Sequence, residues 1–175
     1  MVNELTVGHS DPMAHSVKLL IVGDGPVTDA LTVMVSALGW PVTVTSTAPT
    51  IDPDVDAVVI TSHHEDVDGP AIRSALAAGV GYVGAMGSRR TQQRRRDWLL
   101  ADGVAENALA ALHAPIGLDI GADQPGEIAL SILAEVVAVR SGRLAATSNA
   151  VTSIGDRDGA IHPELAPGEA YCPGG

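Results

Sequence analysis

The feature that most constrains this fold is an apolar run that ends in glycine and leads through a tight turn into a helix. Residues 18–23 read KLLIVG, and the stretch TDALTVMVSALGW beyond the turn has helically spaced apolar residues and stops at Gly39. A buried strand, a turn and a helix are predicted in that order. Two more strands are predicted at VTVTS (42–46) and DAVVITS (56–62), and the Pro- and Asp-containing loop between them predicts a short, irregular crossover.

The same alternation continues in the second half of the chain. A helix is predicted over GPAIRSALAAG (69–79), and a fourth strand over GYVGAMG (81–87). Two helices are then predicted at TQQRRRDWLLADG (91–103) and AENALAALH (105–113), followed by a non-helical connector, APIGLDIGAD. The chain thus repeats the order strand, loop, helix.

The longest predicted helix is PGEIALSILAEVVAVR. Pro125 stands at the favoured first position of this helix, and Gly142 stands just past its end. One face of the helix is apolar and is expected to pack on the core; it carries Ile128, Ile132, Leu133 and Val136.

Strands and helices of these lengths predict a parallel sheet covered by helices, an α/β fold of the doubly wound, Rossmann-like class. We expect the strand order 3-2-1-4, in which the first and fourth strands are neighbours. The 175 residues suit a single domain, and a core built without Phe from Ala, Val, Leu and Ile suits buried parallel strands. We expect an N-terminal extension at 1–16, the domain at 17–144 and an irregular, Gly- and Pro-rich tail at 145–175.

Charge and cysteine content disfavour several classes of protein. The net charge of -11 argues against nucleic acid as a partner, and an aromatic content of 2% leaves few platforms for stacking bases. Cys172 is the only cysteine, so no intrachain disulfide is expected and a reducing, cytoplasmic location is predicted. The N-terminal segment lacks a signal-peptide pattern, and no apolar run reaches the roughly eighteen residues of a membrane span.

A glycine turn joins the first predicted strand to the first predicted helix. Gly23, Gly25 and Thr28 occupy the three positions of a G-x-G-x-x-G dinucleotide fingerprint, with Thr28 in place of the third glycine. The two glycines allow the backbone to turn tightly and to approach a pyrophosphate at the helix N-terminus. Asp24 and Pro26 complete this turn, and we include them among the candidate cofactor-binding residues.

The acidic residue that binds the ribose in such folds is missing. It is expected at the end of the second strand, where the chain has Ser46 between two threonines. Small hydroxyl groups tolerate a 2'-phosphate, so Ser46 leaves NADP as acceptable as NAD. A Rossmann turn that binds no dinucleotide is the alternative.

Positive charge is concentrated in one segment, MGSRRTQQRRR (86–96), which holds five of the ten Lys and Arg residues. With the strand order 3-2-1-4, the turn GDGP and the turn GSRR would face each other at the carboxyl edge of the sheet, where doubly wound folds bind ligands. We therefore predict an anion site formed by Ser88, Arg89 and Arg90 in the turn itself.

The three remaining arginines, Arg94 to Arg96, are predicted to form a solvated face. Consecutive helical residues are about 100° apart, so these side chains cannot share one ligand. Arginines near a helix N-terminus oppose the helix dipole, and no acid follows in the sequence until Asp97. Trp98, Leu99 and Leu100 are expected to anchor the far end of this helix.

The segment SHHEDVD (62–68) is expected to be a polar loop beside the same crevice. His63 is the histidine most suited to face the crevice, and the spacing matches no zinc signature, so no metal site is assigned. The chain has no G-x-S-x-G elbow and no phosphate loop of the Walker type. No catalytic nucleophile is predicted.

These residues resemble the C-terminal Rossmann domain of the XdhC/CoxI family, maturation factors of xanthine and carbon monoxide dehydrogenases. The resemblance runs from about 18 to 142 and is most specific in YVGAMGSRR (82–90) and PIGLDIGADQPGEIALSILAE (115–135). Proteins of this kind are thought to hold the molybdenum cofactor, as molybdopterin or its dinucleotide, and to pass it to the target enzyme. The resemblance implies a cleft set of Gly23, Gly25, His63, Asp68, Gly84, Gly87, Ser88, Arg89, Arg90 and Asp119.

The resemblance implies an accessory protein of a molybdenum hydroxylase that binds molybdenum cofactor or a nucleotide and is more a chaperone than an enzyme. Typical members carry a further N-terminal domain with a cysteine-containing motif, whereas about seventeen residues precede the first strand here. Either cofactor transfer does not use a thiol of that domain, or the domain is a separate polypeptide and a partner; we also expect self-association through the long apolar helix. An NAD(P)-dependent oxidoreductase and a non-catalytic nucleotide-binding sensor are the alternatives.

Overall fold

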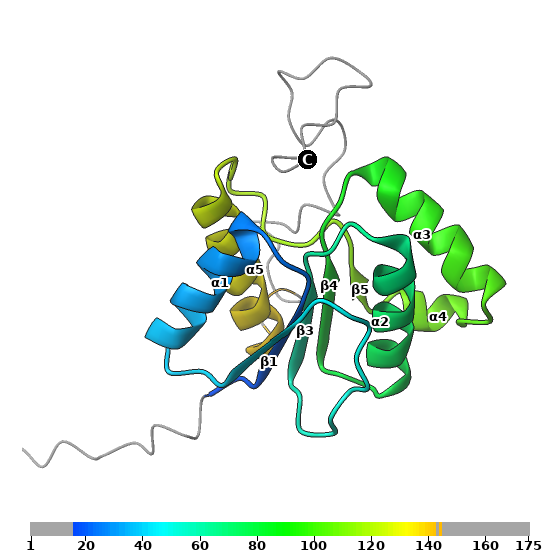
Figure 1. Cartoon of the computed structure of the whole chain (residues 1–175), viewed down its shortest axis with the longest axis horizontal. Helices are drawn as coiled ribbons and strands as arrows, with labels where there is room; N and C mark the ends of the chain where they lie inside the picture. Colours follow the sequence, from blue (N-terminus) through cyan, green and yellow to red (C-terminus); the bar gives the residue numbers. More distant parts are fainter. Residues whose placement is uncertain (1–15, 143, 145–175) are drawn as a thin grey trace, which may run out of the picture.

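The computed structural model describes residues 16–142 and residue 144. Five parallel strands form one sheet between two layers of helices, as Figure 1 shows. The elements in chain order are β1 (Leu19–Val22), α1 (Pro26–Ala37), β2 (Val42–Thr45), β3 (Ala57–Ile60), α2 (Glu65–Ala77), β4 (Tyr82–Ala85), α3 (Arg89–Ala101), α4 (Glu106–Leu109), β5 (Leu112–His113) and α5 (Pro125–Arg140). The predicted doubly wound α/β class is confirmed. The predicted extension and tail, with Cys172, lie outside the described residues, apart from Ser16.

The predicted strand order is wrong. The observed order is β2-β1-β3-β4-β5, so β3 stands between β1 and β4. All four residues of β3 are buried, whereas β2 has two exposed and two half-buried residues. The apolar sequence AVVI of β3 stabilises the fold most when both of its faces are buried by helices. The sequence VTVT of β2 contains two polar threonines, so this strand can lie at the exposed edge of the sheet. The crossover between them contains no helix, as predicted.

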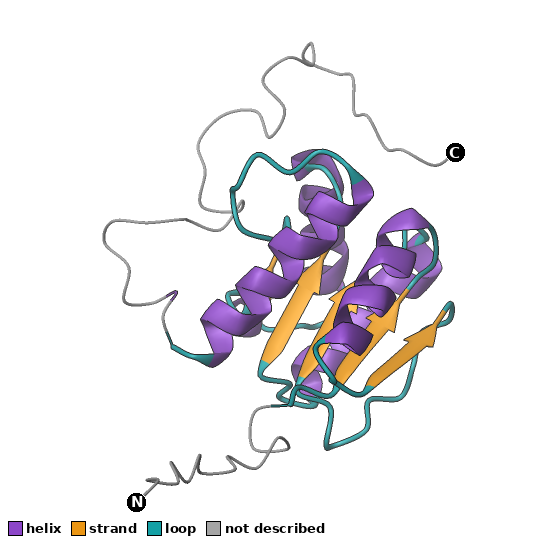
Figure 2. Cartoon of the chain, turned by 90° about the vertical axis from the view of Figure 1, so that its left-hand side faces the viewer, coloured by secondary structure: helices purple, strands orange, loops and turns teal. Residues whose placement is uncertain are grey.

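The helices cover the two faces of the sheet in separate layers. α1 and α5 pack together on one face, over a core that includes Leu31, Ile132 and Val136. α2 and α3 cover the other face, where Ile72 and Leu99 are fully buried. Figure 2 views the layer of α1 and α5 across the strands, and the loops gather at the two ends of the strands.

Several helix boundaries differ from the predicted ones, and the differences affect the candidate site. α2 begins at Glu65, so the second half of the predicted polar loop 62–68 is the first turn of a helix. α3 begins at Arg89, so Arg89 and Arg90 lie in the helix and not in the turn before it. At the far end of α3, Leu99 is buried as expected, but Trp98 and Leu100 are exposed.

The last two described helices differ in how well the sequence predicts them. α5 begins at Pro125, and a capping box caps its N-terminus. In this box Glu127 accepts hydrogen bonds from the N–H groups of Asp123 and Gln124, and these two bonds lower the pKa of Glu127. The helix predicted at 105–113 is wrong after Leu109, because residues 112–113 form β5 beside β4. Two residues carry no strand pattern, so tertiary pairing decides this element.

No helix among the described residues is long and apolar enough to cross a membrane.

Candidate functional site

Three loops meet at the carboxyl edge of the sheet: 23–25 after β1, 61–64 after β3 and 86–88 after β4. Because β3 lies between β1 and β4, the turn GDGP neighbours the 61–64 loop and does not face GSRR across adjacent strands. The chain leaves β1 in one direction and β3 in the other, which places the topological switch point between these two strands. The crevice predicted between the first and fourth strands is corrected accordingly.

Gly23 allows the first two loops to approach each other. Its φ is +132°, and a Cβ atom there would lie 2.4 Å from both the backbone nitrogen of Ser62 and Oγ1 of Thr61. No other residue fits without moving the end of β3. The glycine predicted to bring the backbone close to a ligand therefore also brings it close to a neighbouring strand.

Thr28, which replaces the third glycine of the fingerprint, has a structural partner. Its buried hydroxyl lies 2.7 Å from the hydroxyl of Thr61, so α1 is joined to the loop after β3 by a side-chain hydrogen bond. Gly25 is the N-cap of α1 and offers no side-chain cap, so the first N–H groups of this helix receive no acceptor from the cap residue. Ser46 is exposed just beyond β2, and Asp24 and Pro26 are exposed around Gly25.

The loop before α3 is built differently, because its own residues cap the helix. Gly87 has a φ of +132°, and Ser88 is the N-cap, whose hydroxyl accepts a hydrogen bond from the N–H of Thr91 at 3.2 Å. Arg89 and Arg90 follow as the first two helical residues, and both are exposed. The predicted anion site thus consists of a capped helix start with two exposed guanidinium groups.

Two side chains of α3 donate hydrogen bonds to the backbone carbonyl groups of this loop. Gln92 Nε2 donates to the carbonyl oxygens of Ala85 and Gly87 at 3.1 and 3.2 Å. Arg95 donates to the carbonyl oxygen of Met86 at 3.0 Å and to Oε1 of Gln92 at 2.7 Å. Three consecutive carbonyl groups are therefore bound by one turn of the helix that follows them.

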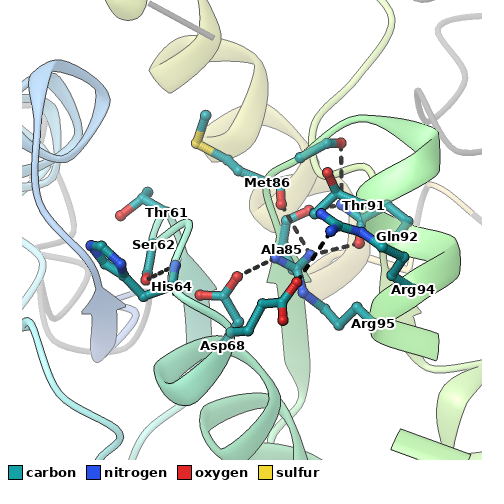
Figure 3. A network of polar contacts seen from close by, with 12 residues as sticks. Thr61, Ser62, His64, Asp68, Ala85, Met86, Thr91, Gln92, Arg94 and Arg95 are labelled. Carbon is teal, nitrogen blue, oxygen red and sulfur yellow. Dashed lines mark hydrogen bonds and ion pairs between the residues drawn. The ribbon is translucent and has the colours of Figure 1, made fainter. Parts of the chain in front are cut away.

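Arg95 is buried, which corrects the prediction that it belongs to a solvated face. Its guanidinium donates to Oδ2 of Asp68 at 2.5 Å, and each of the two side chains is 5% exposed. Figure 3 shows Arg95 between Asp68 of α2 and the loop that precedes α3. Among the described residues, Oδ1 of Asp68 has no hydrogen-bond partner. Helical geometry turns Arg95 inward while its neighbours on either side point elsewhere.

Arg94 and Arg96 remain on the surface, as predicted. Arg94 forms an ion pair with Glu65 at 3.3 Å, and Arg96 forms one with Glu106. Exposed pairs of this kind contribute about 0–1 kcal/mol each. The acids that the sequence lacks before Asp97 are thus supplied by α2 and α4.

Comparison with known proteins places this arrangement in a family. The match to the XdhC Rossmann domain extends over residues 19–136, from β1 to the third turn of α5. The chain belongs to the XdhC Rossmann domain family. The resemblance seen in the sequence is confirmed.

The relatives of this XdhC Rossmann domain are longer proteins. It is 31% identical over 129 residues to the molybdenum cofactor insertion chaperone PaoD of Escherichia coli, covering 71% of this chain and 40% of PaoD. It is 38% identical over 91 residues to the uncharacterized protein YqeB of Escherichia coli, covering 52% of this chain and 16% of YqeB. It is 33% identical over 85 residues to a probable xanthine dehydrogenase subunit of Bacillus subtilis, covering 49% of this chain and 24% of that protein.

A solved structure has the same fold. The crystal structure of a xanthine dehydrogenase from Bacillus halodurans superimposes with a TM-score of 0.59 and 26% sequence identity, covering 76% of this chain and 47% of that one. The chain spans less than half the length of this structure and of each of the three relatives.

The other predicted residues of the XdhC Rossmann domain occupy different environments. His63 is exposed in the 61–64 loop, and Asp119 is half-buried in the connector before α5. Gly84 is buried in β4, where a Cβ atom would lie 2.4 Å from Cδ1 of Ile116, so packing alone requires a glycine there. No group of three or more His, Cys, Asp or Glu side chains within residues 16–142 is placed to hold a metal ion.

A second buried carboxylate, which sequence reasoning missed, lies on the opposite face of the sheet. Glu135 of α5 is fully buried and accepts hydrogen bonds from the hydroxyl of Tyr82 at 2.6 Å and from the N–H of Gly117 at 2.8 Å. Nδ1 of His113 lies 3.3 Å from its other oxygen, and the rings of His113 and Tyr82 stack with centroids 4.7 Å apart. Burial, followed by the charge and hydrogen bond of Glu135, raises the pKa of Tyr82 well above 10.0.

Sequence reasoning missed Glu135 and Gln92, and each has a weak signal in the sequence. Glu135 stands among apolar residues on the helix face that packs on the core, and Gln92 stands three residues before Arg95 on the same side of a helix. A charged residue in an apolar stripe is buried with a partner far more often than it is left alone. The identity of that partner does not follow from the pattern.

Proposed function

We propose that this domain binds the molybdenum cofactor and assists its insertion into a molybdenum hydroxylase. The similarity to the molybdenum cofactor insertion chaperone PaoD carries this proposal, because it extends over 71% of the chain. The similarity to a probable xanthine dehydrogenase subunit supports the choice of target enzyme. In this role the protein holds and delivers a cofactor and needs no catalytic nucleophile.

The carboxyl edge of the sheet suits the phosphate of such a cofactor, whether molybdopterin or its dinucleotide. The N-terminus of α1 has a glycine cap with no side chain, so its backbone N–H groups can receive an anion. Arg89 and Arg90 are exposed at the start of α3 and provide positive charge. We assign cofactor binding to the loops 23–26, 61–64 and 86–90, with Ser46, Asp68, Gly84 and Asp119 as further candidates.

The test is equilibrium binding of molybdopterin to the purified chain. If Arg89 binds the phosphate, Arg89→Ala should weaken the affinity by about tenfold or more, because a charge-assisted hydrogen bond is lost. Arg73→Ala is the matched control, because Arg73 is an exposed arginine of α2 that pairs with Asp102. Equal affinity of Arg89→Ala and the wild type would exclude this assignment.

A nucleotide is the alternative ligand, and the glycine turn before α1 favours it. No carboxylate follows β2 to select NAD, so NADP is an acceptable ligand as well. A thermal-shift comparison of molybdopterin, NAD, NADP, CTP and GTP separates the alternatives, because a ligand that binds the native state raises the melting temperature. A shift with NADP and none with molybdopterin would favour an oxidoreductase or a nucleotide sensor.

The partners are also part of the proposal. Reconstitution of a cofactor-free molybdenum hydroxylase should proceed faster with this chain than without it. A separate polypeptide that carries the cysteine-containing domain, self-association through α5 and a reducing, cytoplasmic compartment stay predictions. Size measurement of the purified chain tests the second of these.

A further inference from the structure

The loop between β4 and α3 is held by a chain of polar contacts that begins in a different helix. Asp68 of α2 binds Arg95, Arg95 binds the Met86 carbonyl and Gln92, and Gln92 binds the carbonyls on either side of Met86. We propose that Asp68 and Arg95 are positioning residues that fix this loop in the conformation that receives an anion. The proposal rests on the site assigned under the proposed function.

The carbonyl contacts determine where the N–H groups of the loop point. A trans peptide unit is planar, so the N–H of a residue points opposite to the carbonyl of the residue before it. The Met86 carbonyl points to Arg95 and the Gly87 carbonyl points to Gln92. The N–H groups of Gly87 and Ser88 therefore point away from these two side chains. These two N–H groups directly precede the first residue of α3, next to the exposed Arg89 and Arg90.

Gly87 makes this conformation possible, and the side chains make it unique. Gly87 has a φ of +132°, a backbone conformation that is accessible to glycine at low energetic cost. An unrestrained glycine also adopts several other backbone conformations at similar cost. A glycine loop without contacts samples those alternatives, and an anion must then select the competent one at a cost in affinity. Three bound carbonyls remove this cost before the ligand arrives.

The role of Asp68 is to hold Arg95 in place. The Asp68 and Arg95 side chains are each 5% exposed, and a buried ion pair is often no more stabilising than an apolar pair of the same volume. What the ion pair provides is a fixed orientation of the Arg95 guanidinium. A guanidinium bound on one edge by a carboxylate presents its remaining N–H groups at fixed angles. Asp68 lies in the first turn of α2, so it also ties the loop after β3 to the loop after β4.

The experiment measures loop order and anion affinity separately, with pyrophosphate as the probe. Asp68→Asn and Arg95→Gln should speed amide hydrogen exchange at Thr91, whose N–H donates to the Ser88 hydroxyl, and should weaken pyrophosphate binding by about tenfold, the equivalent of one lost hydrogen bond to a charged group. Gln92→Ala is the third variant, because Gln92 is half-buried and its loss leaves the ion pair intact. It should affect both measurements in the same direction.

Two controls separate positioning from general stability. Arg73→Gln removes an exposed ion pair of α2 and should change neither measurement. Val136→Ala removes buried apolar volume from α5, on the opposite face of the sheet, and should lower the free energy of unfolding without changing pyrophosphate affinity. A merely structural role for Asp68 and Arg95 would make their variants behave like Val136→Ala.

The positioning proposal is overturned if the folded Asp68, Arg95 and Gln92 variants bind pyrophosphate as the wild type does, or if exchange at Thr91 is unchanged. It also fails if the wild type does not bind pyrophosphate, because no anion site then exists to be positioned. Molybdopterin binding is measured in parallel and reports on the proposed function. Loss of pyrophosphate affinity in the variants, with no molybdopterin binding by the wild type, would leave the positioning role intact and exclude that cofactor.

Discussion

Among residues 16–142, each face of the sheet buries one carboxylate, and the two carboxylates have different partners. Asp68, on the side of α2 and α3, has a cationic partner in Arg95 and keeps one oxygen without a hydrogen bond among the described residues. Glu135, on the side of α1 and α5, receives hydrogen bonds from a tyrosine hydroxyl and a backbone N–H. One site is a charge pair under a loop, and the other is a carboxylate held by a tyrosine hydroxyl and a backbone N–H, with an imidazole nitrogen 3.3 Å away.

The difference indicates different roles. The donors around Glu135 tie α5, β4 and the connector at Gly117 together, so this carboxylate joins elements of the core. The pair of Asp68 and Arg95 joins two neighbouring loops at the ligand-binding edge of the sheet. The two faces should therefore respond unequally, because loss of Arg95 leaves a charged carboxylate buried on one face, whereas loss of the Glu135 charge leaves hydrogen-bonding groups with a weaker acceptor on the other.

The largest effect is expected from Arg95→Met. This change leaves the Asp68 carboxylate buried without its cation, which costs about 3–5 kcal/mol of unfolding free energy. Urea denaturation of the variant and the wild type measures the difference. Arg73→Met is the control for an exposed pair and should cost about 0.2–1 kcal/mol. Equal losses in the two variants would contradict a special role for burial.

Glu135→Gln should have a smaller effect. Glutamine removes the charge and turns one oxygen into an NH2 group, so the hydroxyl of Tyr82 and the N–H of Gly117 keep only a neutral carbonyl acceptor; we expect a loss of about 1.5–3 kcal/mol. The same urea denaturation measures it. A loss greater than that of Arg95→Met would reverse the order inferred for the two faces.

Tyr82→Phe should have the smallest effect, about 1.5 kcal/mol, because Glu135 keeps its bond from Gly117. The contribution of the Tyr82 hydroxyl can be recognised from how the free energy of unfolding depends on pH. The pKa of Tyr82 is raised in the folded protein above its ordinary value of 10.0, so its stabilising contribution is complete below about pH 10 and is lost as the pH rises through the folded pKa. The wild type should therefore lose more stability than Tyr82→Phe as the pH rises from about 9 to about 12. Parallel curves for the two proteins would argue against the hydrogen bond.

Much of the fold follows from local patterns. The strands β1, β3 and β4 are short apolar runs before loops, and α5 carries both its initial proline and its terminal glycine in the sequence. Helical periodicity identified α1 and the body of α2 and α3. The first turns of α2 and α3 were missed because EDVD and RR are polar, and a polar turn of helix has the composition of a loop.

The candidate site was less predictable than the fold. The turn GDGP and the cap residue Ser88 carry local signals, and the structure places both at the carboxyl edge of the sheet. Arg95 could not be separated from Arg94 and Arg96 by sequence, since three adjacent arginines have the same local pattern. Its burial depends on Asp68, which is 27 residues away and belongs to another helix.

The sequence by itself determined the α/β class, the membership of a family and the glycine turns, because periodicity, caps and positive φ values depend on residues close together in the chain. Only the tertiary structure decided the strand order, the existence of β5 and the partner of each arginine. These features depend on which segments meet in space, where burial selects the apolar β3 for the centre of the sheet and sets Arg95 against Asp68.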